Sequence, residues 1–117
     1  MDTESALSAL NALSQSTRLE IFRLLVRHEP DGLPAGDVAR HLDVPQNTIS
    51  AHLATLTRAG LLTSQRHSRL IVYRACLPSL RGLMLFLVRD CCAGSPELCA
   101  PLIANLSSSC PSPESCP

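Results

Sequence analysis

The sequence has 117 residues and a formal net charge of zero, with 45% hydrophobic but only 3% aromatic residues. A chain of this length supports one small domain with a mainly aliphatic core. No apolar run approaches the length of a membrane-spanning helix, and the acidic N-terminus, with Asp2 and Glu4, differs from the basic start of a secretory signal. We therefore expect a cytoplasmic protein without a membrane partner.

The N-terminal part of the chain contains two expected helices. Residues 3–13 form a short amphipathic helix with a 3.6-residue apolar period. Its apolar positions are Leu7, Leu10 and Leu13. A second helix begins near residues 16–17, where Thr17 and Glu20 have the spacing of a capping box. Its many large apolar residues predict the central helix of the core, and Pro30-Asp31-Gly32 ends it.

Two short helices with a tight connection follow, at residues 34–42 and 45–59. Pro34 suits the first turn of the earlier helix, and Gly60 suits the end of the later one. The apolar positions are Val38, Leu42, Ile49, Leu53 and Leu56. Because the second helix is polar on its outer face, the pair matches a helix-turn-helix.

Residues 61–65 and 70–74 are rich in Val, Ile, Thr and Tyr and flank the polar turn 66–69. This pattern predicts a β-hairpin. A hairpin directly after the second helix of a helix-turn-helix is a wing. The fold class is therefore mainly α with a small β-hairpin, a winged helix-turn-helix.

The last expected helix spans residues 78–92 and carries a continuous apolar stripe. The stripe consists of Leu80, Leu83, Met84, Leu87 and Cys91. It is too apolar for solvent, so a partner helix is expected. After residue 93 the chain becomes rich in proline and serine, without apolar periodicity after residue 106. We expect one DNA-binding and dimerisation domain at 1–93 and a flexible tail at 94–117.

The zero net charge conceals a segregation of charge. Residues 1–37 carry six acidic and three basic side chains, whereas residues 38–81 carry six arginines against one acid, Asp43. A basic centre in a neutral chain is typical of phosphate contact. A solvated basic face explains the charges equally well.

Four segments together resemble the ArsR/SmtB family of metal-sensing transcriptional repressors, over about residues 10–92. These segments are TRLEIFRLL at 17–25, QNTISAHL at 46–53, LTRAGL at 56–61 and VYR at 72–74. The adjacent Cys91-Cys92 pair, with a third cysteine nearby, resembles an arsenite-responsive subgroup. The resemblance implies a homodimer that represses a resistance operon and leaves operator DNA when its inducer binds.

Three features depart from patterns within that family. The third helix contains no cysteine, and the last helix contains no histidine of the kind that binds zinc in another branch. The turn of the wing has Ser68 where glycine is common. A zinc sensor of the last-helix type is therefore not expected.

DNA contact is expected from the 45–59 helix and from the wing turn, because base reading normally uses the N-terminal half of a recognition helix. The predicted DNA-binding residues are Gln46, Asn47, Thr48, Ser50, Thr55, Arg66 and Arg69. Asn and Gln pair with adenine edges, and the arginines enter the minor groove or hold phosphates. The alternatives for Ser50 and Thr55 are hydrogen bonding to their own helix or contact with phosphate. His52 is interpreted as a packed residue.

Three of the six cysteines, Cys91, Cys92 and Cys99, lie within nine residues. In a reducing cytosol, metal, metalloid or redox chemistry is favoured over disulfides. Trivalent arsenic is soft and prefers thiolates, commonly three of them in a pyramid. We therefore predict that these three thiols of one chain bind trivalent arsenic (arsenite), which acts as the inducer.

The consecutive cysteines diverge by about 100° on a straight helix, so the helix end must open for both to reach one atom. The segment 94–96, Gly-Ser-Pro, allows this and lets Cys99 fold back. The alternatives are inert buried cysteines, a redox- or persulfide-responsive dithiol, a site for cadmium, lead or zinc, and methylarsenite. Cys76 is interpreted as a small buried residue, and Cys110 and Cys116 as passive or as a source of a fourth thiol.

Sequence motifs of enzymes are not found. The chain has no Gly-rich phosphate loop, no Gly-x-Ser-x-Gly and no His-Glu-x-x-His. No cysteine is followed six residues later by arginine, as a thiol-based arsenate reductase would need. We expect no enzyme and no catalytic cofactor; the expected partners are double-stranded operator DNA and a second copy of the chain.

Overall fold

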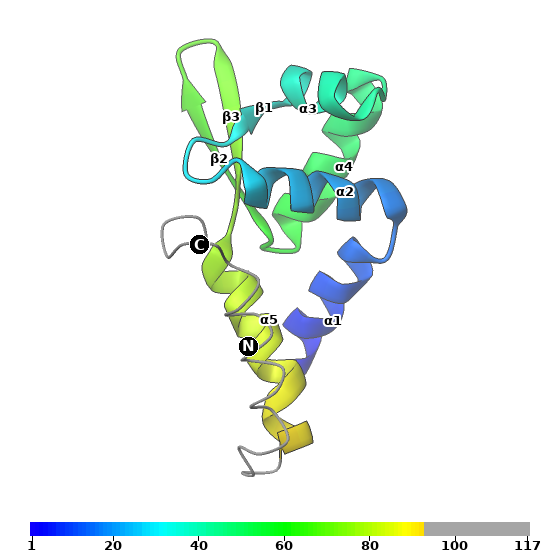
Figure 1. Cartoon of the computed structure of the whole chain (residues 1–117), viewed down its shortest axis with the longest axis vertical. Coiled ribbons are helices and arrows are strands. Elements are labelled where there is room, and N and C mark those ends of the chain that lie inside the picture. The colour runs from blue at the N-terminus through cyan, green and yellow to red at the C-terminus, as the bar shows by residue number, and fades with distance from the viewer. Residues whose placement is uncertain (93–117) are drawn as a thin grey trace.

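The computed structural model describes residues 1–92, with side chains described as far as Val88. Its elements, drawn in Figure 1, are α1 (Thr3–Leu13), α2 (Ser16–Arg27), β1 (Leu33–Pro34), α3 (Ala35–Leu42), α4 (Gln46–Arg58), β2 (Leu62–His67), β3 (Leu70–Ala75) and α5 (Leu77–Cys92). The five expected helices and the hairpin are confirmed. The two hairpin strands are longer than predicted and leave a two-residue turn. The predicted tail, 94–117, lies outside the described residues.

The sheet has three strands in the order β1-β3-β2, both pairs antiparallel. β1 was not predicted, because its two residues are too few to show an alternating pattern. It pairs Leu33 with Tyr73 and Pro34 with Val72. Pro34 is therefore an edge-strand residue and the N-cap of α3, not a residue of its first turn.

The core is aliphatic, as the composition predicts. Its largest fully buried side chains are Ile21, Leu25, Val38, Ile49, Leu53, Leu56 and Leu61. They come from α2, α3, α4 and the residue before β2. α2 contacts α1, α3, α4 and β3, as expected of a central helix. At its start, the side chain of Gln15 accepts a hydrogen bond of 2.9 Å from the Arg18 amide. The predicted capping box of Thr17 and Glu20 is wrong, because the N-cap is Gln15, two residues before Thr17, and both predicted residues lie within the helix.

The buried face of α1 differs from the predicted leucine seam. Ala6, Ala9 and Ala12 are buried, whereas Leu7 is 60% and Leu10 is 38% exposed. Small alanines let α1 pack closely on the core, and Leu7 and Leu10 are turned away from it, whereas Leu13 is half-buried and packs against the core.

Figure 1 shows α1 and α5 side by side at one end of the molecule, opposite the tip of the β2–β3 hairpin. On α5, Leu83 is buried, but Met84, Leu85 and Leu87 are each more than a third exposed. Met84 and Leu87, three residues apart, share one side of α5, and Leu7 and Leu10 share one side of α1; these four side chains form the exposed apolar face, whereas Leu85 lies about 160° around α5 from Leu87. No helix among the described residues is long and apolar enough to cross a membrane.

Candidate nucleic-acid interface and thiol segment

The helix-turn-helix is formed by α3 and α4, and the turn between them begins with a residue in the left-handed backbone conformation. Asp43 has φ 55°, which ends α3 and lets the Val44 amide donate a 3.2 Å hydrogen bond to the Ala39 carbonyl. Pro45 then caps α4. The fully buried side chains of α4 are Ile49, Leu53 and Leu56. The core thus fixes the rotation of α4 and leaves its other faces toward solvent.

The four predicted base readers in the first half of α4 are all exposed. They are Gln46, Asn47, Thr48 and Ser50. The side-chain oxygen of Asn47 accepts a 2.9 Å hydrogen bond from the Thr48 amide, which leaves the Asn47 amide group as a donor. This surface matches the predicted one; contact with bases stays a prediction.

Thr55 occupies a different position from this group. Its hydroxyl donates a hydrogen bond to the Ala51 carbonyl at 3.2 Å. Arg58 Nη2 lies 3.4 Å from the Thr55 hydroxyl oxygen. Nine residues separate it from Gln46, which is about 13 Å along a helix. The structure therefore fits the alternative in which Thr55 bonds to its own helix. His52 is half-buried, in agreement with a packed residue.

The wing turns through two residues, Ser68 and Arg69, between the paired His67 and Leu70. Ser68 takes φ 60°, the left-handed region that two-residue hairpin turns require and that glycine adopts most easily. Both predicted wing arginines, Arg66 and Arg69, are exposed.

The arginines of the basic centre fall into two groups. Arg74 forms an ion pair with Glu29, and this carboxylate raises the pKa of Arg74 above its ordinary value. Arg40 pairs with Asp37. Within the described part of the chain, Arg66 and Arg69 form no ion pair. Arg58 of α4 and Arg81 of α5 form no ion pair there either, so the wing carries two of the four unpaired arginines of the basic centre.

Two of the predicted regions meet in one surface hollow. Gln46 and Ser50 of α4 line it together with Arg69 of the wing turn. Leu70, Ile71 and Tyr73 of β3 and residues 34–36 complete its lining. Sequence reasoning placed α4 and the wing on one surface but missed Tyr73, which resembled an ordinary strand residue.

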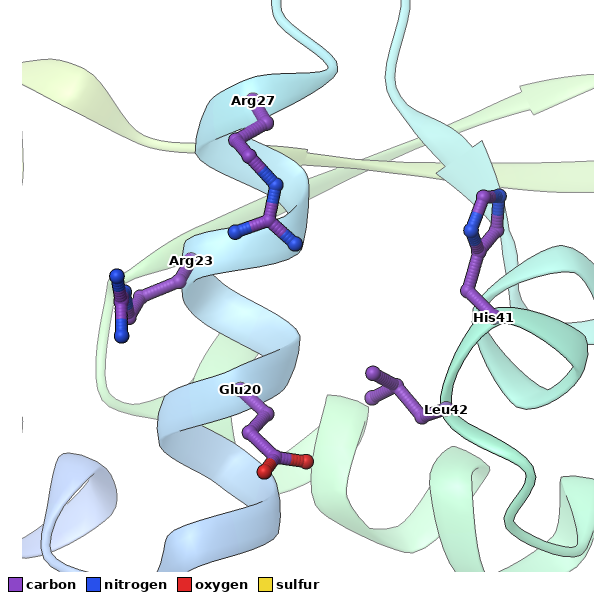
Figure 2. Close-up of a pocket in the computed structure, with 5 residues that line it drawn as sticks. All are labelled: Glu20, Arg23, Arg27, His41 and Leu42. Carbon is purple, nitrogen blue, oxygen red and sulfur yellow. The ribbon is translucent and has the colours of Figure 1, made fainter.

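A second hollow lies between α2 and α3. In Figure 2, Arg27 extends from α2 toward the gap, His41 faces it from α3, and Arg23 points away. Glu20 and Leu42 complete the lining, so the hollow combines both signs of charge. The His41 ring contacts the His28 ring edge-on, with centroids 5.3 Å apart. None of these residues was predicted as a site residue.

The predicted thiol site is only partly within the described residues. Cys91 and Cys92 are the last two residues of α5, and Cys99 lies outside the described residues, as do Cys110 and Cys116. Residues 1–88, whose side chains are described, contain no group of three His, Cys, Asp or Glu side chains placed to hold a metal ion. The three-thiol site stays a prediction.

Cys76 sits between β3 and α5. It is half-buried, and its Sγ lies 3.2 Å from Ser79 Oγ. Its amide donates a 2.8 Å hydrogen bond to the Leu61 carbonyl. This position agrees with a packed structural residue, and it joins the wing directly to α5.

Residues 13–65 match the family model described as a helix-turn-helix domain. A solved ArsR-like transcriptional regulator from Rhodococcus sp. RHA1 is 33% identical and superposes with a TM-score of 0.69, covering 83% of this chain and 89% of that one. This match has both the fold and substantial sequence identity over most of each chain.

HlyU from Vibrio cholerae, described as a transcriptional activator, is 26% identical over 78% of this chain and 82% of its own length. Its solved structure superposes with a TM-score of 0.60 over 79% of this chain and 99% of that one, and another is described as reduced HlyU. A further structure, described as a possible transcriptional regulator for arsenical resistance, is 26% identical with a TM-score of 0.61, covering 71% of this chain and 83% of that one.

These relatives are transcriptional regulators, which excludes an enzyme. The exposed half of α4, the wing and the matching sequence lead to one conclusion. The chain belongs to the ArsR/SmtB family of winged helix-turn-helix, DNA-binding transcriptional regulators.

Proposed function

We propose that this chain is a cytoplasmic, homodimeric repressor that leaves its operator when trivalent arsenic binds the thiolates of Cys91, Cys92 and Cys99. The observation that carries the proposal is the position of two consecutive cysteines at the end of α5, just after its exposed apolar face. The relative described in connection with arsenical resistance supports the arsenic assignment. Trivalent arsenic acts as the inducer, and no catalytic cofactor is involved.

Dimerisation follows from the exposed apolar face of α1 and α5. Leu7 at 60%, Met84 at 38% and Leu87 at 45% exposure are costly to leave in water. Each leucine covered by a second copy contributes on the order of 1 kcal/mol. A dimer also places two recognition helices about one DNA turn, roughly 34 Å, apart, which a single weakly binding module cannot do.

The connection between β3 and α5 provides a mechanical link from thiols to DNA. Only Cys76 separates Ala75, the buried end of β3, from Leu77, the start of α5. Because the Cys76 amide also bonds to the Leu61 carbonyl, the start of α5 is held to the base of the wing. A reorientation of α5 caused by arsenic binding would therefore move the wing and change the spacing of the two α4 helices.

A redox or persulfide signal read by the same thiols is the second candidate. It is favoured by the likeness to HlyU, for which a structure of the reduced protein is described. Three thiols in nine residues suit either chemistry, because both depend on the thiolate as nucleophile or ligand. Cadmium, lead, zinc and methylarsenite remain alternative ligands of the same segment.

The test is fluorescence anisotropy of the reduced protein on DNA from upstream of its own gene, titrated with arsenite. Wild type should be released at low micromolar arsenite, and Cys91→Ser and Cys99→Ser should stay bound. Cys76→Ser, which removes a thiol outside the segment, is the matched control and should respond like wild type. DNA binding indifferent to arsenite, but lost in peroxide or persulfide and restored by a thiol reductant, would replace the arsenic signal by a redox signal.

A further inference from the structure

The face of the wing that looks toward the helices changes character along its length. Residues paired across β2 and β3 share a face, and every second residue returns to it. At the base, Leu62 pairs with Ala75, and both are buried in the core. The next pair on this face is Ser64 with Tyr73, and the outermost is Arg66 with Ile71. From the base of the wing toward its tip, this face therefore carries apolar side chains, then hydroxyl groups, and then a positive charge.

Tyr73 lies at the middle of this series, beside the hollow between α4 and the wing. Its ring packs against the core and is half-buried. Its hydroxyl forms no hydrogen bond within the described residues. Every buried side-chain oxygen in that part of the chain has a partner, so the unbonded Tyr73 hydroxyl is exposed to solvent. It is a donor held in place by a packed ring.

The hollow contains further polar groups without an internal partner. Within the described residues, the side chains of Gln46 and Ser50 form no hydrogen bond, in contrast to Thr55 and Thr57, whose hydroxyls bond to helix carbonyls. Arg69 adds a guanidinium group from the wing turn. Neutral donors and a cation therefore converge on one exposed depression.

We propose that this hollow binds the sugar-phosphate backbone of one DNA strand, with Tyr73 and Ser50 donating hydrogen bonds to phosphate oxygens. The proposal rests on DNA binding by the family fold and does not depend on the inducer. When α4 occupies a major groove and the wing the adjacent minor groove, the strand that separates these grooves must cross between them. The hollow lies at this crossing, and Arg66 and Arg69 complement the charge of the strand.

The chemistry of the donors gives distinct signatures. A tyrosine hydroxyl is neutral, so it strengthens phosphate contact without releasing a counterion, whereas each arginine contact contributes about 0.9 to the slope of log affinity against log salt. Tyr73→Phe keeps the packed ring and removes only the donor. We expect about three- to tenfold weaker binding to specific and scrambled DNA alike, with an unchanged salt slope.

The decisive experiment combines this variant with a scan of single neutral methylphosphonates through the upstream DNA fragment. Wild type should lose affinity at a particular phosphate in each half-site, and that loss should shrink in Tyr73→Phe and in Ser50→Ala but not at other phosphates. Gln65→Ala, on the opposite face of the wing, is the control and should reproduce the wild-type scan. Unfolding midpoints in urea verify that each variant is folded.

Unchanged affinity of Tyr73→Phe, or a phosphate scan identical to that of wild type, would overturn the proposal. Loss confined to one base sequence would also overturn it, because it would make Tyr73 a base reader. Absence of DNA binding by wild type would overturn it together with the repressor function, whereas DNA binding that ignores arsenite would leave it intact.

Discussion

Arg74 of β3 and Glu29, two residues after α2, join two segments that are 45 residues apart in the sequence. Arg74 Nε and Nη2 donate hydrogen bonds of 3.2 and 2.9 Å to the two carboxylate oxygens of Glu29. The side chain of Glu29 is only 10% exposed. This bidentate ion pair fixes the base of the wing to the loop that follows α2.

Loss of this pair should loosen the wing. In Glu29→Gln the carboxylate charge is absent, so we expect a lower urea midpoint and faster hydrogen exchange in β3. Asp37→Asn removes the more exposed pair with Arg40 and should change the midpoint much less. Equal effects of both variants would contradict a special role for the Glu29–Arg74 pair.

The same pair should be insensitive to pH in the neutral and alkaline range. The hydrogen bond and the charge of Glu29 raise the pKa of Arg74 above its ordinary value. A cation with a raised pKa contributes stability that is lost only as pH rises through that pKa in the folded state. The difference in urea midpoint between wild type and Glu29→Gln should therefore be the same at pH 7 and pH 10. A difference that disappears by pH 10 would contradict this assignment.

The turn of the wing should be improved by glycine. Ser68 adopts φ 60°, which costs an L-residue about 1 kcal/mol relative to a residue without a Cβ. Ser68→Gly should raise wing protection in hydrogen exchange, and Ser68→Val should lower it, because a β-branched residue is more strained there. Opposite signs for the two variants would show that the turn is not left-handed at this position.

The helical period of the apolar residues sufficed to predict the longer helices. The seam of Ile49, Leu53 and Leu56 placed α4 and its exposed face, and Gly60 lies just after the end of α4 at φ 82°. Hydrophobicity alone misassigned α1, because alanines fill the close contact and Leu7 and Leu10 face outward. Which face of α1 is buried depends on the distance between helix backbones, and the local sequence does not encode this distance.

The site was predictable where it lies on one element and less so where elements meet. The first turns of α4 and the wing turn were identified from local pattern, but Tyr73 depends on the pairing of β3 with β2 and on the position of α4 beside it. Arg74 was counted with the DNA-facing charges, and only the fold reveals its distant partner Glu29. The thiol site rests on spacing and chemistry alone.

The proposed dimer predicts different effects of two similarly exposed leucines. Leu87 of α5 is 45% exposed, and Leu19 of α2 is 42% exposed. Leu87→Glu places a charge in the proposed interface and should shift the protein to monomer, with at least about tenfold weaker DNA binding. Leu19→Glu should leave mass and affinity nearly unchanged. Sedimentation equilibrium distinguishes the cases, and a dimeric Leu87→Glu would place the interface elsewhere.

Two polar residues of α4 should differ in their effect on base recognition. Gln46 is exposed at the start of the helix, while the Thr55 hydroxyl is occupied by the Ala51 carbonyl. Gln46→Ala should reduce discrimination at one base pair by about 1–3 kcal/mol. Thr55→Val should change specificity little. Competition binding with a library of single base-pair changes measures both, and the reverse order would require α4 to dock by its C-terminal half.

The most direct test of the thiol switch is the affinity of arsenite for the free protein and for the same protein saturated with upstream DNA. Coupling between two ligands is reciprocal, so if arsenic releases DNA, DNA must weaken arsenic binding by the same factor, typically about 5–150-fold. We predict that arsenite binds the DNA complex more weakly by the factor by which it weakens DNA binding. Equal arsenite affinity with and without DNA would contradict the switch.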